Sequence, residues 1–183
     1  MKDPTVLPDD LPIPEDDGAA AHLAGWRLPS LTLTAADGAP VDLASIPGLV
    51  VVFAYPRTGR PGEPSLVDDW DAIPGARGCT PQTCAFRDLH AEFAALGARV
   101  FGLSTQDTAY QREMVDRLHV PFPVLSDAEL ALTRALRLPT MDVAGQTLIK
   151  RMAWIARDGT IERVFYPVFP PDRNAADVLA ALQ

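Results

Sequence analysis

The chain has 183 residues, of which 48% are hydrophobic and 22% are charged, and its formal net charge is −8. This length and composition are typical of one soluble globular domain. The acidic balance argues against nucleic acid or an anionic membrane as the main partner, because both repel a negatively charged surface.

Residues 1–25 are rich in proline, aspartate and alanine and show little periodicity, so we expect an extended N-terminal arm followed by one domain over 26–183. In chain order, the patterns predict a β-hairpin at 31–34 and 41–43, a buried strand at 49–55, a long loop at 57–78, a helix capped by Thr80 and ending at Gly97, a strand at 99–103, a helix at 109–118 capped by Asp107 or Thr108, a short strand at 122–125, a helix at 128–136, strands at 148–156 and 161–166, and a terminal helix at 174–182.

Strands alternate with helices along the middle of the chain, and a hairpin follows near its end. Alternation of this kind favours a mainly parallel core, and the late hairpin adds an antiparallel pair. The sequence therefore predicts an α/β fold with a central mixed sheet flanked by helices.

The two cysteines lie in one segment, Gly78-Cys79-Thr80-Pro81-Gln82-Thr83-Cys84. Cys79 precedes the predicted helix, where unpaired backbone N–H groups and the helix dipole favour a thiolate over a thiol. The thiolate is the nucleophilic form of cysteine, so this position suits catalysis.

Cys84 lies five residues after Cys79, inside the predicted helix. Five residues of helix separate two Cα atoms by ~7.5 Å along the axis and turn the side chains apart. A disulfide needs Cα atoms within about 7 Å and converging side chains. The two cysteines can therefore bond only if the first turns of the helix unwind.

The cysteines alone leave other interpretations open. They are compatible with two buried structural thiols. A zinc site with His90 is less favoured, because the spacing is not C-x2-C and only three candidate ligands lie nearby. A disulfide oxidoreductase is disfavoured by the absence of C-x-x-C. A redox sensor or binding protein on the same fold also remains open.

At these residues the sequence resembles the Q-type peroxiredoxins, also called bacterioferritin comigratory proteins. The resemblance runs from about residue 26 to the C-terminus. The segments that carry it are Val52-Phe53-Ala54-Tyr55-Pro56, Gly78-Cys79-Thr80 with Cys84 and Phe86-Arg87-Asp88, Phe101-Gly102-Leu103-Ser104-Thr105, Phe122-Pro123-Val124-Leu125-Ser126-Asp127, and Lys150-Arg151-Met152-Ala153-Trp154-Ile155.

The resemblance implies a thioredoxin-like three-layer sandwich and a peroxidase that acts on hydrogen peroxide and organic hydroperoxides. Cys79 would become a sulfenic acid, and Cys84 would condense with it as an intramolecular disulfide. Thioredoxin or a similar dithiol would then reduce that disulfide. Arg151 would hold the thiolate and orient the peroxide, and Pro56 would shield the pocket.

One departure concerns the family motif Pro-x-x-x-Thr-x-x-Cys, because Ala76 stands where the threonine is expected. Pro56 and Thr58 lie about twenty residues before Cys79, which indicates an insertion at about 59–77 with Thr58 as the supplier of the hydroxyl. Thr80 is the alternative, or no threonine acts. The insertion contains Trp70 in an acidic cluster, and a lid, a dimer contact, a reductase docking patch and a solvated loop all remain open.

No nucleotide motif of the G-x-G-x-x-G or Walker type occurs, so we expect no cofactor and no metal. The chain shows neither a secretory signal nor an apolar run near the ~20 residues that span a bilayer. The expected location is the cytoplasm, and the expected state is a monomer or weak homodimer.

Overall fold

The computed structural model describes residues 3–183, so the first two residues of the predicted arm lie outside the described part of the chain. It contains a seven-stranded mixed sheet with the order β2-β1-β5-β4-β3-β8-β9 and a separate sheet of β6 and β7. The strands are β1 (Leu33–Ala35), β2 (Pro40–Val41), β3 (Leu49–Ala54), β4 (Ala98–Ser104), β5 (Val124–Ser126), β6 (Thr140–Val143), β7 (Gln146–Ile149), β8 (Met152–Arg157) and β9 (Thr160–Phe165). The helices are α1 (Cys79–Asp88), α2 (His90–Ala95), α3 (Thr108–Leu118), α4 (Ala131–Leu136) and α5 (Asn174–Leu182), with short 3-10 turns η1 (Leu43–Ser45), η2 (Trp70–Ala72) and η3 (Pro171–Arg173).

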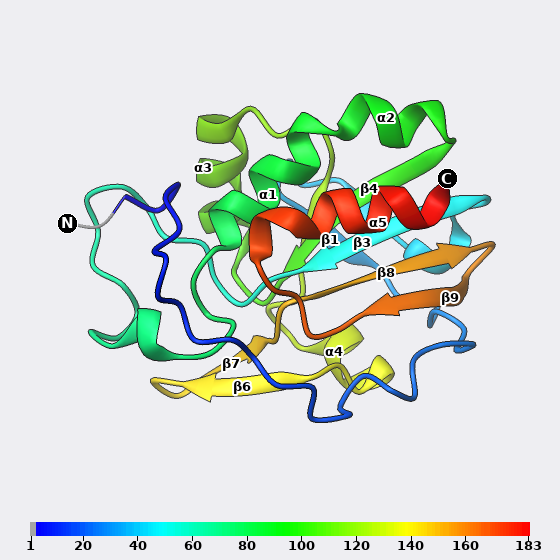
Figure 1. The fold of residues 1–183 in the computed structure, drawn as a ribbon. Helices are drawn as coiled ribbons and strands as arrows, with labels where there is room; N and C mark the ends of the chain where they lie inside the picture. The colour runs from blue at the N-terminus through cyan, green and yellow to red at the C-terminus, as the bar shows by residue number, and fades with distance from the viewer. Residues whose placement is uncertain (1–2) are drawn as a thin grey trace.

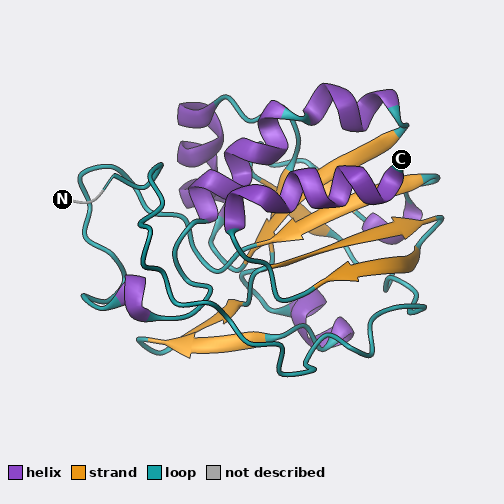
Figure 2. Ribbon diagram, viewed as in Figure 1, coloured by secondary structure: helices purple, strands orange, loops and turns teal. Residues whose placement is uncertain are grey.

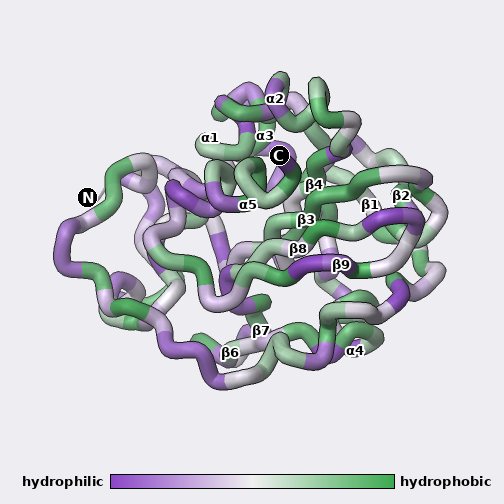
Figure 3. The backbone as a smooth tube through the Cα atoms, turned by 45° about the vertical axis from the view of Figure 1, so that its right-hand side comes forward, coloured by the Kyte–Doolittle hydropathy of each residue, from purple (hydrophilic) through white to green (hydrophobic). Residues whose placement is uncertain are grey.

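The large sheet is covered on both faces, and β3 runs through its centre. Val51 and Phe53 of β3 pack in one hydrophobic cluster and Val50 and Val52 in another, as the two-residue period of a strand requires. Figure 1 shows α1, α2, α3 and α5 on one face and α4 on the other. Figure 3 shows hydrophobic residues along β3 and β4. The predicted three-layer α/β arrangement with an N-terminal hairpin is confirmed.

Most predicted elements are found with shifted bounds. The carboxylate of Asp107 caps α3, accepting a hydrogen bond from the Tyr110 N–H at 2.7 Å, as predicted. The short strand predicted at 122–125 is β5, which begins at Val124. The helix predicted at 128–136 begins later, at Ala131, because the Asp127 carboxylate accepts the backbone N–H groups of Leu132 and Thr133.

Two predictions about the cysteine helix are wrong. Thr80 does not cap it, because α1 begins at Cys79 and its N-cap is Gly78, a left-handed residue with φ 105°. The helix also does not run unbroken to Gly97, because α1 and α2 are separated at Leu89. The rings of Phe86 and Phe93 nevertheless stack 5.6 Å apart across this break. The helical spacing of apolar residues therefore continues through the break and conceals it.

The single strand predicted at 148–156 is also wrong. It is split at Lys150 and Arg151 into β7, which pairs with β6, and β8, which pairs with β3. The Lys150 N–H bonds to the Pro139 carbonyl, outside both sheets. Apolar residues flank the break on both sides, so the sequence pattern does not show it. The break leaves Arg151 directly before β8.

The N-terminal arm and the loop between β3 and α1 lie side by side (Figure 1). Figure 2 shows this side of the molecule as loop apart from the short η2 turn. The Arg77 guanidinium donates hydrogen bonds to the carbonyls of Asp3 and Val6. Further along the arm, Leu23 is fully buried in the core. The arm is therefore packed against the domain just before Cys79.

Among residues 3–183, no helix has both the length and the apolar character that crossing a membrane requires.

We expect Gly78→Ala to destabilise the fold more than Gly97→Ala. Both glycines have positive φ, 105° and 73°, so both substitutions carry the left-handed penalty of about 1–2 kcal/mol. A Cβ at Gly78 would also press on Pro171 and lie 2.9 Å from Leu7 Cδ2, whereas a Cβ at Gly97 meets nothing within 4 Å. Overpacking of this kind adds about 1–3 kcal/mol. Urea unfolding of the two variants measures the difference, and equal losses would contradict the packing of Leu7 on Gly78.

Candidate active site

The candidate site lies at one edge of the large sheet. β3 and β4 are parallel, so their carboxyl ends meet at this edge, where functional residues of such sheets commonly gather. β8 is antiparallel to β3 and pairs Met152 with Ala54, the last residue of β3. Arg151, one residue before Met152, is thereby placed at the same edge.

Cys79 is the first residue of α1, and its side chain is only 3% exposed. The left-handed Gly78 turns the chain into the helix, so the free N–H groups of the first turn surround Cys79. The thiol lies 3.5 Å from the Ala76 carbonyl, which can accept its proton in a hydrogen bond. The helix dipole favours a negative charge at this position.

Arg151 is the side chain that faces the thiol. The residue is 2% exposed, and its Nη2 lies 3.2 Å from Cys79 Sγ. The same Nη2 also donates to the carbonyls of residues 75, 76 and 77, at 3.1, 3.2 and 2.9 Å. Within residues 3–183 no carboxylate forms an ion pair or hydrogen bond with Arg151. A Cys79 thiolate would therefore be the anion that balances this buried charge.

A chain of amides holds the other side of the guanidinium. Arg151 Nη1 donates to Gln82 Oε1 at 2.5 Å, and Gln82 Nε2 donates to Asn174 Oδ1 at 2.9 Å. Both amide residues are buried and join α1 to α5. Gln82 and Asn174 were missed in the sequence. Gln82 stands three residues after Cys79, on the same helix face, and this spacing could have identified it as a site residue. No comparable pattern in the sequence pointed to Asn174.

Thr58 lines the same small cavity as Cys79 and is 1% exposed. Its hydroxyl and its backbone N–H both donate to Gln106 Oε1, at 3.1 and 3.0 Å. Gln106 Nε2 returns a hydrogen bond to the Thr58 carbonyl at 3.3 Å. Thr80 also lines this cavity. The structure thus brings both candidate threonines to the cysteine, and Gln106 is a residue that the sequence analysis missed.

Pro56 is buried two residues after the end of β3 and does not line the cavity, whereas the next two residues, Arg57 and Thr58, do. The neighbouring Tyr55 phenol is fully buried, and this burial, together with the charge of Cys79, raises its pKa. Tyr55 therefore stays protonated at neutral pH.

Cys84 is half-buried on α1, and both cysteines are free thiols. Burial raises the pKa of the Cys84 thiol, opposed by the nearby positive charge of Arg87. Arg87 itself donates hydrogen bonds to Asp88 Oδ1 at 2.8 Å and to the Leu118 carbonyl at 2.9 Å, so these contacts give it a structural role. Cys84 follows Cys79 on one continuous helix, so a bond between them still requires α1 to unwind.

The chemistry of this arrangement is that of a buried nucleophilic thiol beside a fixed positive charge. A thiolate on Cys79 would be stabilised by the guanidinium and by the helix amides, and an anionic leaving group would meet the same donors.

A family model described as Redoxin matches residues 23–182. Chloroplastic peroxiredoxin Q of Oryza sativa subsp. japonica is 31% identical over 161 residues, which are 87% of this chain and 66% of that protein. Chloroplastic peroxiredoxin Q of Sedum lineare is 30% identical over 161 residues, which are 87% of this chain and 77% of that protein. The chain thus spans just under two thirds of the rice protein.

Solved structures agree with the fold. The peroxidoxin BcpB of Mycobacterium tuberculosis is 27% identical and superposes with a TM-score of 0.71, covering 87% of this chain and 95% of that one. The bacterioferritin comigratory protein of Xanthomonas campestris, at 22% identity and a TM-score of 0.66, covers 94% of this chain and 97% of its own. These likenesses confirm the predicted thioredoxin-like fold.

We expect Arg151→Met to slow the alkylation of Cys79 by iodoacetamide at neutral pH by at least about tenfold. A hydrogen bond to a charged group contributes about 1.5–3 kcal/mol, and its loss removes that much support from the thiolate. The measurement uses a Cys84→Ser background, so that a single thiol reacts. Lys150→Met, which removes the neighbouring positive charge that pairs with Asp17 at 2.8 Å, is the matched control and should alkylate at the parent rate. An unchanged rate in Arg151→Met would contradict the role of the contact.

Proposed function

This chain belongs to the Redoxin family and is a peroxiredoxin of the Q type, and we propose that it reduces hydroperoxides with Cys79 as the attacking thiolate. The observation that carries the proposal is the contact of 3.2 Å between Arg151 Nη2 and the buried Cys79 Sγ at the start of α1. A helix N-terminus and a guanidinium both favour the reactive form of the thiol.

In the first step, the Cys79 thiolate attacks one oxygen of the peroxide. An S–O bond forms, the O–O bond breaks, and Cys79 becomes a sulfenic acid. The leaving oxygen takes a proton and departs as water or an alcohol. The Arg151 guanidinium supports this step because it can hold the thiolate and stabilise the charge that develops on the leaving oxygen.

Thr58 is the proposed donor to the peroxide. Its hydroxyl now donates to Gln106 Oε1, but that oxygen also accepts the Thr58 N–H, so the amide keeps a partner when the hydroxyl turns away. Pro56, buried directly before Arg57 and Thr58, remains a proposed shielding residue.

In the second step, Cys84 attacks the sulfur of the Cys79 sulfenic acid, and water leaves as the disulfide forms. The intact α1 holds the two residues too far apart, so its first turns unwind before this step. Unwinding also removes Cys84 from the half-buried position that raises its pKa. The thiolate needed for the attack therefore forms more readily in the unwound state.

A dithiol of the thioredoxin type is the proposed reductant, because two electrons must return to the disulfide in each cycle. Cells maintain such dithiols in reducing compartments, and we propose the cytoplasm as the location. The working form that we propose is a monomer or weak homodimer.

The function is tested by peroxide consumption with thioredoxin and its reductase as the electron source. The intact protein should consume hydrogen peroxide, and Cys79→Ser should abolish the reaction. Cys84→Ser should still consume about one equivalent of peroxide, because the first step needs only Cys79, and mass spectrometry should find one added oxygen on it. Full turnover by Cys79→Ser would end the proposal. Oxidation of the intact protein no faster than that of a free thiol would favour a redox sensor instead.

Replacement of each threonine by valine identifies the hydroxyl that acts. We expect Thr58→Val to lower kcat/KM for hydrogen peroxide by about 10- to 100-fold, because it removes the proposed donor to the charge that develops on the peroxide. Thr80→Val is the matched control, since Thr80 is equally buried and lines the same cavity. The reverse pattern would assign the hydroxyl to Thr80, and small effects in both would mean that neither threonine acts.

A further inference from the structure

The cavity above Cys79 is small and partly built from the insertion. Its volume is about 40 Å³. Side chains from four parts of the chain meet there: Cys79 and Thr58 from the domain, Leu66 and Trp70 from the insertion, Tyr110 from α3, and Pro4 from the arm. A peroxide must pass these side chains to reach the thiol, which is 3% exposed.

The first part of the insertion is fixed to α3. The guanidinium groups of Arg57 and Arg60 lie over the Tyr110 ring, 4.8 and 4.0 Å from its centroid. Arg60 Nε lies 3.5 Å from Glu113 Oε2, and Arg117 donates to the Gly59 carbonyl at 3.4 Å. These contacts hold the start of the insertion against the helix.

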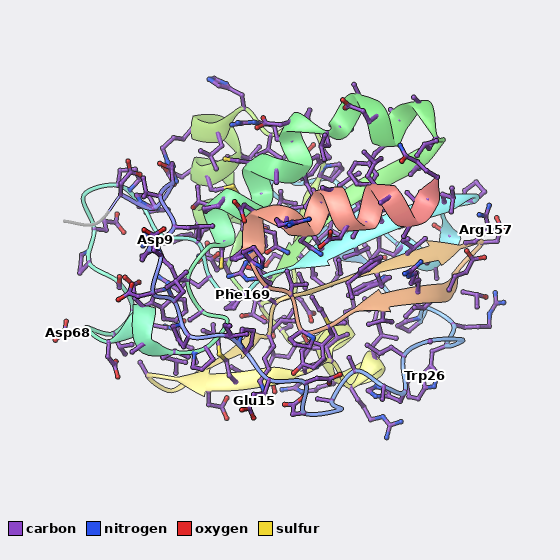
Figure 4. All side chains as sticks on the ribbon, in the orientation of Figure 1. Asp9, Glu15, Trp26, Asp68, Arg157 and Phe169 are labelled. Carbon is purple, nitrogen blue, oxygen red and sulfur yellow. The ribbon has the colours of Figure 1, made fainter. Side chains whose placement is uncertain are left out.

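The second part is fixed to the small sheet. Trp70 is 6% exposed and shares a hydrophobic cluster with Ala76 and with Leu148 of β7. Leu66 and Val67 pack against the same cluster. Figure 4 shows Asp68 directed outward from this side of the molecule. The acidic side chain of Asp68 therefore faces solvent, while the apolar side chains beside it face the protein.

The volume decides which peroxides fit. A cavity of about 150 Å³ can hold a benzene ring, whereas a single water needs only about 10–15 Å³. A cavity of about 40 Å³ therefore accepts the two oxygen atoms of hydrogen peroxide. An aromatic or branched alkyl group does not fit within that volume, so it would have to stay at the open side of the cavity or displace the anchored insertion.

Resting on the proposed peroxidase function, we propose that the insertion at 59–77 is a size filter, in which Leu66 and Trp70 restrict Cys79 to hydrogen peroxide and exclude bulky hydroperoxides. Selection here is by size, because Leu66 and Trp70 supply apolar walls beside the polar Ser65 and Arg77, which also line the cavity from the insertion. Hydroperoxides with an aromatic or tertiary alkyl group would be kept away from Cys79. The reaction at the thiolate would be the same for hydrogen peroxide and for these bulky hydroperoxides.

The test compares kcat/KM for hydrogen peroxide and for cumene hydroperoxide, with dithiothreitol as the reductant. This constant reports the reaction of the peroxide with Cys79, whichever later step limits turnover. We expect the intact protein to favour hydrogen peroxide by at least tenfold. Leu66→Ala should raise kcat/KM for cumene hydroperoxide at least fivefold and lower this preference, because it opens the wall of the cavity.

Val67→Ala is the matched control. Val67 is the next residue and packs against the same cluster, but it does not line the cavity, so the preference should stay at the parent value. Equal kcat/KM values for the two peroxides in the intact protein would overturn the filter and leave the peroxidase standing. Equal shifts in both variants would overturn it too, because general loosening would then explain them. Consumption of neither peroxide would end the peroxidase proposal itself.

Discussion

The fold around the site depends on one buried contact, between the Arg151 guanidinium and Cys79. A buried charge is costly unless it is paired and hydrogen-bonded. Here the carbonyls of residues 75–77 and the Gln82 amide supply acceptors, and no carboxylate competes for the charge within the described residues. Those three carbonyls belong to the end of the insertion. The insertion therefore lines the approach to Cys79 and also supplies backbone acceptors to its charge partner, Arg151.

A second layer of structure encloses this contact. The insertion is held by Tyr110 on one side and by Leu148 on the other, and the arm closes over Arg77. An inserted loop of this length is tolerated when its ends are close and its apolar residues find cover. The small cluster around Trp70 provides that cover, separately from the two main clusters of the sheet. The insertion that limits access to Cys79 thus has its own packing, apart from the main core.

Local patterns in the sequence predicted the sheet, most helices and the position of Cys79 at the start of a helix, because each depends on neighbouring residues. Arg151 came from the family resemblance, and the break beside it was missed because apolar residues continue on both sides. Gln106 and Asn174 were missed for a different reason. Each reaches its partner across tens of residues, Gln106 to Thr58 and Asn174 to Gln82. Such pairs are created by tertiary packing and leave no local periodicity.

The packing of the arm on Arg77 and Gly78 has a thermodynamic consequence for the proposed cycle. The disulfide requires α1 to unwind next to Gly78, which Leu7 covers, so oxidation must also loosen the arm. The free energy spent on that loosening is a penalty on the oxidised form alone. Each 1.4 kcal/mol of it raises the reduction potential of the Cys79–Cys84 couple by about 30 mV. A segment far from the cysteines in the sequence thereby makes the protein a stronger oxidant toward its reductant, and electrons flow into the disulfide more readily.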